Sequence, residues 1–125
     1  MIFGIGTDIV AVKRMADYWQ RHGERGLEKM LAPAEREACR SSSDPARFLA
    51  KRFAAKEALG KAFGSGVRAP LLLPDIAVLH DELGKPSFSY SPVLAAHFAG
   101  RGIKAHLSIS DEHDYAVAFV ILEKS

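Results

Sequence analysis

The sequence predicts an α+β fold in which an antiparallel sheet packs against one long central helix. The helix is predicted at 47–66, where alanine, leucine, lysine and glutamate dominate. Strands are predicted near both ends of the chain, and the full order is strand, helices, two strands, helix, two strands. A chain of 125 residues is long enough for a core of its own, so we expect a single domain over 1–125.

The first element, at 2–10, is rich in β-branched residues and predicts a buried strand. One face of this strand is bulky, whereas the other is nearly bare at Gly4 and Gly6 before it presents Asp8. Glycine in a strand often marks the close approach of another backbone or a ligand. A carboxylate among apolar residues needs a partner, because an unpaired buried charge is costly. Asp8 therefore either caps the following helix or belongs to a site.

Helical sequence follows from 12 to about 22, and shorter helical segments are predicted around 27–31 and at 33–40. Gly23 and Gly26 are expected to break the chain between the first two segments. The basic residues of this region include Arg14, Arg21 and Arg25. They form either an ordinary solvated face or a docking patch for an acidic partner.

The central helix has clear start and stop signals. Asp44 can cap it and Pro45 suits its first turn, whereas Gly64 and Gly66 are placed to end it. The two glycines and the serine between them form a loop directly after the helix.

The charges on this helix do not form one polar face. Lys56 falls among apolar residues, and a structural ion pair is its expected role. Glu57 and Lys61 are four residues apart and lie beside a strip of alanines. One interpretation is a core helix with a solvated Glu57–Lys61 pair. The other is a helix packed on most sides, from which a few charges project into specific places.

Two short strands are predicted at 75–79 and around 88–90, joined by a turn at 82–86. A further helix begins after Ser91 and runs to about 99. We expect this helix and the central one to cover the antiparallel sheet, which the first strand joins.

The C-terminal stretch predicts a hairpin of strands at 103–110 and 115–122, with a polar turn at 111–114. Along the first of these strands the polar side chains alternate with apolar ones, and His106 lies at the centre of the polar row. This row is either plain solvent-facing sheet or part of a site for anionic groups.

Composition excludes several classes of protein. The formal net charge is only +2, and aromatic residues are not interleaved with the basic ones, which disfavours nucleic-acid binding. The single cysteine, Cys39, allows no internal disulfide and no zinc site, so we expect a reducing cytoplasm. The sequence contains neither a signal-peptide pattern nor an apolar run that would span a bilayer. Motifs typical of nucleoside triphosphate or dinucleotide sites are also absent.

Asp8 and Glu57 are the two carboxylates in apolar or small-residue settings. If the strand packs on the helix, the two can converge and suit Mg²⁺, which takes its remaining ligands from water and substrate phosphates. Lys61 lies one turn beyond Glu57 and could hold a phosphate that the metal also contacts.

Four motifs carry a resemblance to a known family. They are GIGTDIV at 4–10, RFAAKEALGKAFGSG at 52–66, LGKP at 83–86 and HLSIS at 106–110. In this order, spread over essentially the whole chain, they resemble the bacterial holo-[acyl-carrier-protein] synthases, the small group of the 4′-phosphopantetheinyl transferase superfamily.

The resemblance implies an activity: Mg²⁺-dependent transfer of 4′-phosphopantetheine from coenzyme A to a serine of apo acyl carrier protein, with release of adenosine 3′,5′-bisphosphate, in support of fatty acid biosynthesis. It implies that Asp8 and Glu57 bind the metal and that Glu57 and Lys61 are catalytic. Glu57 and a metal-bound water are both candidates for the base. The residues implied to lie against coenzyme A are Arg52, Lys61, Gly64, Ser65, Gly66, Pro86 and His106.

The resemblance also implies that Arg14, Arg21 and Arg25 meet the acidic carrier protein, and that the protein is a homotrimer with sites at subunit interfaces. In one position the chain departs from the pattern: many relatives have a histidine where this sequence has Asp111, and His113 cannot be assumed to replace it. A competing hypothesis is a non-catalytic module that binds an acidic helix through the same arginines.

Overall fold

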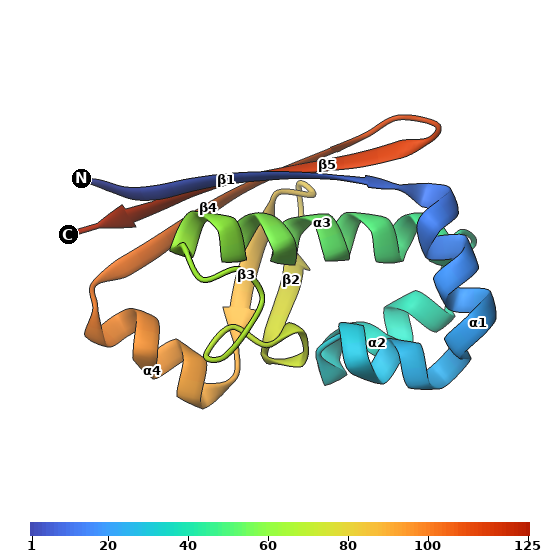
Figure 1. The fold of residues 1–125 in the computed structure, drawn as a ribbon, viewed down its shortest axis with the longest axis horizontal. Helices are drawn as coiled ribbons and strands as arrows, with labels where there is room; N and C mark the ends of the chain where they lie inside the picture. The colour runs from blue at the N-terminus through green and yellow to red at the C-terminus, as the bar shows by residue number, and fades with distance from the viewer.

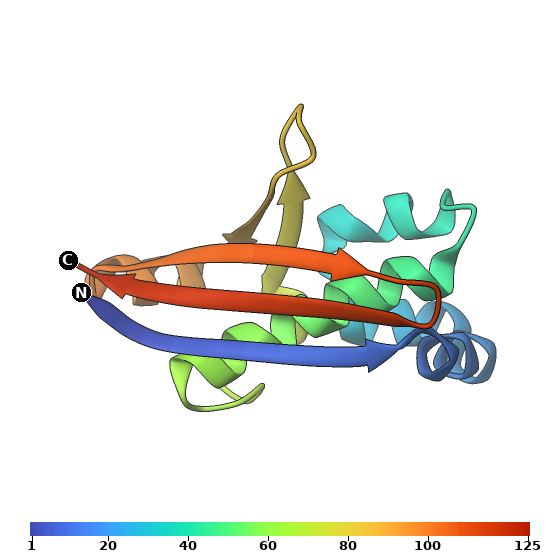
Figure 2. The same ribbon diagram turned by 90° about the horizontal axis from the view of Figure 1, so that it is seen from above.

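The five strands are antiparallel, but they form two sheets rather than the single sheet expected. In the computed structural model, which describes residues 1–125, β1 (Ile2–Ala11), β5 (Tyr115–Lys124) and β4 (Ile103–Asp111) form a three-stranded sheet in the order β1-β5-β4. The hairpin of β2 (Ile76–His80) and β3 (Pro86–Tyr90) is separate and projects away from that sheet (Figure 2).

One long helix organises the rest of the molecule. Helix α3 (Pro45–Phe63) lies along the three-stranded sheet (Figure 1). Helices α1 (Val12–Met30) and α2 (Pro33–Arg40) pack at its N-terminal half, and the 3₁₀ turn η1 (Leu73–Asp75) leads into the hairpin. None of the helices combines the length and apolar composition needed to cross a bilayer.

Two expectations about the helices need correction. Helix α4 (Pro92–Gly100) contacts β3 and β4 near one end of the sheet and does not cover it as α3 does (Figure 1). The helical segment after Val12 breaks only at Gly23, whose φ of 55° and ψ of −137° are not helical, whereas Gly26 is buried within the resumed helix.

The predicted ends of α3 are confirmed. The backbone N–H of Arg47 donates to the Asp44 carboxylate at 3.1 Å, which satisfies one of the free donors of the first turn. At the other end Gly64 has a φ of 99°, a left-handed conformation that favours glycine. The sequence therefore determines both where α3 starts and where the loop after it turns away.

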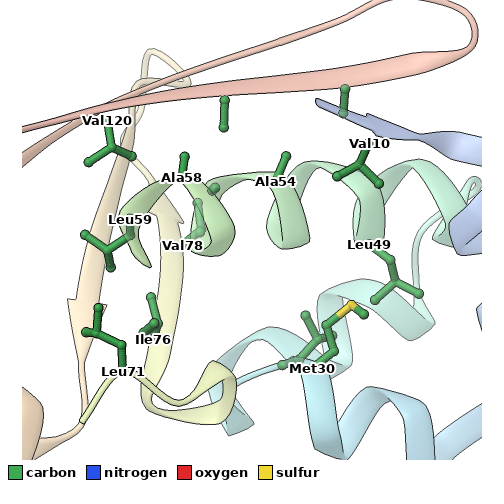
Figure 3. Packing of buried hydrophobic residues seen from close by; sticks show 14 of the residues in the cluster. Val10, Met30, Leu49, Ala54, Ala58, Leu59, Leu71, Ile76, Val78 and Val120 are labelled. Atoms are coloured by element: carbon green, nitrogen blue, oxygen red, sulfur yellow. The ribbon is translucent and has the colours of Figure 1, made fainter. Parts of the chain in front are cut away.

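The bare face of β1 allows α3 to approach it very closely. A β-carbon at Gly4 would collide with the carbonyl oxygen of Ala62, and one at Gly6 would collide with that of Ala58. The glycines thus mark a contact between two backbones, as predicted. The alanines of α3 and small or β-branched residues of the sheet, among them Ala54, Ala58, Val10 and Val120, fill this layer of the core (Figure 3).

The prediction of a buried strand holds for only one face of β1. Its outer face, turned away from α3, leaves Ile5 60% and Ile9 62% exposed in the single chain. The paired strand β5 continues the same surface with Val117 and Phe119, which are 37% and 42% exposed. These four residues form a continuous exposed apolar surface on the sheet.

The backbone contact between β1 and α3 predicts that Gly6→Ala lowers the free energy of unfolding by about 3 kcal/mol, because the added methyl group overpacks a rigid contact. Urea denaturation of the two proteins measures this difference. Gly100→Ala is the matched control, since a β-carbon there has no atom within 4 Å. Equal stability of Gly6→Ala and Gly100→Ala would contradict the assignment of this contact.

Candidate active site

Asp8 and Lys61 meet at the edge of the sheet where β1 lies on α3. Lys61 Nζ donates to Asp8 Oδ1 at 3.0 Å and to the carbonyl oxygen of Thr7 at 3.0 Å. The N-cap residue of α1 is Ala11 and it receives no side-chain cap, so the alternative in which Asp8 caps that helix is wrong. The lysine pairs with the strand and not with Glu57, and the proposed solvated Glu57–Lys61 pair is therefore not the arrangement found.

Glu57 lies beside this pair, half-buried on the same flank of α3. Burial, and then the negative charge of Asp8, raise the pKa of Glu57, whereas the charges of Lys61 and Arg14 oppose this rise. A carboxyl group whose pKa is raised takes up a proton at a higher pH than an ordinary glutamate. The charge of Asp8 on β1 therefore acts on Glu57 of α3.

The two carboxylates have the donor set that a magnesium ion uses in a substrate-assisted site. No group of three or more His, Cys, Asp or Glu side chains forms a complete metal cage in this chain. Mg²⁺ often binds through one or two carboxylates and takes its other ligands from water and phosphates. Asp8 and Glu57 fit that role, and the repulsion that raises the pKa of Glu57 is what a divalent cation would relieve.

The loop after α3 folds back onto the helix. The backbone N–H groups of Gly64 and Gly66 both donate to the carbonyl oxygen of Gly60 at 3.0 Å. A β-carbon at Gly60 would press on the backbone of Gly66, which explains the one glycine inside the helix. Ser65 Oγ donates to the carbonyl oxygen of Gly66 at 2.8 Å. This compact loop therefore turns back beside the last turn of α3, which carries Lys61 (Figure 1).

A cleft of about 630 Å³ lies against α1 and brings together two of the three predicted arginines, Arg14 and Arg21. The guanidinium carbon of Arg14 is 5.2 Å from the centre of the Phe53 ring, one turn before Glu57. Arg14 also acts on the pKa of Glu57, so the cleft adjoins the carboxylates. Arg25 is exposed after the break at Gly23 and does not line the cleft.

Comparison with known proteins identifies the family of this chain. Residues 4–120 match the family model described as the 4′-phosphopantetheinyl transferase superfamily. The chain belongs to this superfamily. It is 58% identical to the holo-[acyl-carrier-protein] synthase of Dechloromonas aromatica over 123 residues, 98% of each protein.

Solved structures of holo-[acyl-carrier-protein] synthases are similar to this chain over nearly its whole length. The holo-[acyl-carrier-protein] synthase of Neisseria meningitidis has a TM-score of 0.95 and 44% identity, covering 99% of this chain and 100% of that one. The Bacillus anthracis enzyme, described as a complex with CoA (3′,5′-ADP), has a TM-score of 0.84 and 36% identity, covering 100% and 99%. The chain is thus a phosphopantetheinyl transferase of the holo-[acyl-carrier-protein] synthase type, with the α+β fold of that group.

Three of the residues expected to contact coenzyme A lie away from Asp8 and Glu57 within one chain. They are Arg52, His106 and Pro86. Lys61 follows Arg52 by nine residues, about two and a half helical turns, so the two occupy opposite flanks of α3. His106 pairs in register with Ile121 on the outer face of the sheet, where its Nε2 lies 3.0 Å from Glu123 Oε1. Pro86 opens β3 on the separate hairpin. One chain alone does not bring these residues to Asp8.

The expected ion pair of Lys56 is confirmed, but its partner, Glu35, was not identified from the sequence. Lys56 is fully buried and its Nζ lies 2.6 Å from Glu35 Oε1. Glu35 is the third residue of a helix that starts with Pro33, a position that usually indicates a capping box. That signal explains its bond to the N–H of Ala32, but it does not predict that the same carboxylate also binds Lys56.

Asp111, where the resemblance led us to expect a histidine, is a structural carboxylate. Asp111 Oδ2 lies 3.0 Å from Arg47 Nη1, and Asp111 Oδ1 lies 3.5 Å from Lys51 Nζ. Arg47 also donates to the carbonyl oxygens of Glu112 and His113, at 2.6 and 2.8 Å. The side chain of His113 is 95% exposed. Asp111 therefore helps fix the β4–β5 turn to the start of α3.

The coupling between the carboxylates predicts that Asp8→Asn lowers the pKa of Glu57, because the substitution removes a like charge and releases Lys61. NMR titration of the Glu57 carboxyl carbon measures this pKa. Asp17→Asn is the control, since Asp17 does not contribute to the shift at Glu57. A pKa of Glu57 that stays unchanged in Asp8→Asn would show that the two carboxylates do not interact.

Proposed function

We propose that residues 1–125 form one transferase domain that moves the 4′-phosphopantetheine group of coenzyme A to a serine of apo acyl carrier protein and releases adenosine 3′,5′-bisphosphate. The observation that carries this proposal is the convergence of Asp8, Glu57 and Lys61 beside the loop 64–66. The names of the similar enzymes, and the coenzyme A named for the Bacillus anthracis structure, support the choice of substrates.

Each residue of the cluster has a role in this reaction. A magnesium ion held by Asp8 and Glu57 would supply positive charge beside the pyrophosphate as the bond to phosphorus breaks. Lys61 binds the same phosphates, because its ammonium group already lies within reach of Asp8 and is more than half exposed. Glu57 is the carboxyl group of this chain that is placed to accept the proton of the attacking serine.

The basic side of α1 is the proposed dock for the carrier protein. Arg14 and Arg21 line the cleft next to Glu57, so an acidic protein bound there would bring its serine towards the carboxylates. Arg25 extends the positive charge of this surface beyond the cleft. By resemblance to its group, the transferase serves fatty acid biosynthesis in the cytoplasm.

We further propose that the active protein is a homotrimer with sites between subunits. Asp8 lies at the β1 edge of the sheet, whereas His106 lies on the β4 edge strand. A complete site then needs the β1 side of one chain against the β4 side of the next. Such a head-to-tail contact closes into a ring rather than a two-fold dimer. The exposed apolar face of β1 and β5 offers the surface for it.

Incubation with coenzyme A, magnesium and apo acyl carrier protein is expected to add the mass of phosphopantetheine to the carrier protein. Removing the metal with EDTA, or making Asp8→Asn or Glu57→Gln, should slow the reaction roughly 100-fold, because the charge on the pyrophosphate is no longer balanced. Mass spectrometry of the carrier protein measures the rate. Glu37→Gln, an exposed change on α2, should have the wild-type rate.

Two results would contradict this function. The first is that the folded wild-type protein, supplied with several carrier proteins, transfers no phosphopantetheine to any of them. The second is that Asp8→Asn and Glu57→Gln both bind carrier protein and transfer phosphopantetheine at the wild-type rate. That result would show that these two carboxylates do not bind a metal needed for the reaction.

The proposed interface predicts that Ile9→Lys converts a species of about three chain masses into monomers, because a charge is placed in the apolar contact. Light scattering after size exclusion measures the mass, and transfer activity should fall with it. Val93→Lys is the control, since Val93 is an isolated apolar residue on α4 that is 82% exposed. A wild-type protein that elutes as a monomer at assay concentration would contradict the trimer.

A further inference from the structure

Glu35 is a buried carboxylate at the junction of several elements. It is 2% exposed, and its Oε1 accepts from the N–H of Ala32 at 2.9 Å and from Lys56 Nζ at 2.6 Å. Its Oε2 accepts from the N–H of Val78 at 3.0 Å and lies 3.1 Å from Arg52 Nε. A single side chain from α2 thus connects to α3 and β2.

Lys56 and Arg52, the two cations that contact Glu35, differ in how many of their hydrogen-bond donors have an acceptor within the chain. Lys56 Nζ uses three acceptors within the chain: Glu35, the carbonyl oxygen of Met30 at 2.9 Å and that of Leu73 at 3.2 Å. Arg52, by contrast, forms an ion pair in which Nε lies 3.1 Å from Glu35 Oε2 without hydrogen-bond geometry, and its guanidinium carbon lies 4.3 Å from the centre of the Phe48 ring. Its terminal nitrogens donate no hydrogen bond within the chain, although the side chain is only 10% exposed.

The free end of Arg52 lines a cleft of about 310 Å³ whose other walls are mostly polar. Besides Arg52 and Phe48, its lining consists of two serines, one carboxylate, two further cations and a histidine: Ser42, Ser43, Asp44, Arg47, Lys51 and His80. Burial, and then the positive charges of Arg52 and Lys51, lower the pKa of His80, which indicates a positive potential in this cleft. Hydroxyl groups and a fixed guanidinium in a positive cleft suit a phosphate group.

We propose that Glu35 is a positioning residue for coenzyme A: it holds Arg52 by Nε so that the terminal nitrogens face this cleft and bind a phosphate group of the substrate. A guanidinium binds phosphate through two parallel hydrogen bonds, so the orientation of its plane decides the affinity. The guanidinium is contacted by the Phe48 ring and, at Nε, by Glu35, and neither contact involves its terminal nitrogens as hydrogen-bond donors. This inference rests on the proposed function, because it takes coenzyme A as the ligand.

Comparing Glu35→Gln with Lys56→Met separates positioning from stability. Each variant removes one member of the buried network and should lower the melting temperature, but only Glu35→Gln releases Arg52. We expect Glu35→Gln to raise the KM for coenzyme A about tenfold with kcat near the wild-type value, because a charge-assisted contact loses its geometry. Lys56→Met should keep the KM within about twofold. Isothermal calorimetry with coenzyme A should give the same ratio of Kd values.

Arg52→Lys provides a second test if Glu35→Gln does not fold. It keeps the positive charge but loses Nε and the planar group, and should weaken coenzyme A binding about tenfold as well. Wild-type affinity in Arg52→Lys, or an equal rise in KM for Glu35→Gln and Lys56→Met, would overturn the inference. Its failure is distinct from failure of the proposed function, in which the wild-type protein itself would bind no coenzyme A.

Discussion

The site depends on the backbone contact between β1 and α3. Gly4 and Gly6 carry no side chain, so the helix reaches the strand until Ala58 and Ala62 lie on its backbone. Because α3 lies so close to β1, Lys61 Nζ can donate to both Asp8 Oδ1 and the carbonyl oxygen of Thr7. A larger residue at either glycine would separate the carboxylates as well as destabilise the core, so one packing constraint serves both stability and chemistry.

Much of this arrangement could be predicted because its signals are local in the sequence. The cap at Asp44, the glycines after α3 and the two bare positions of β1 each act on neighbouring residues. The division into two sheets and the exposed face of β1 could not be predicted in this way. Both depend on which strands pair over long separations and on which surfaces stay without a partner, and strand periodicity contains no such information.

The same limit applies to Glu35 and to the residues expected at coenzyme A. The position of Glu35 near the start of α2 suggests a local cap. Its contacts with Arg52 and Val78 arise only when α2, α3 and β2 meet. A resemblance names site residues without saying whether one chain or two supply them. The structure shows that Arg52 and Lys61 lie on opposite flanks of α3, so a site containing both must cross a subunit boundary or hold a long ligand.

The small net charge of the chain conceals a separation of charge across α3. Glu57 and Lys61 lie with Asp8 on one flank of α3, whereas Arg52 lies on the opposite flank. The first flank holds two carboxylates against one lysine and suits a cation. Arg52, although paired with Glu35 at Nε, has terminal nitrogens that donate no hydrogen bond within the chain and suit an anion. A ligand that meets both needs must carry several phosphate groups and bring a divalent cation with one of them. Coenzyme A with magnesium has this charge pattern, which is why the proposed contact between subunits would place it between opposite flanks of two copies.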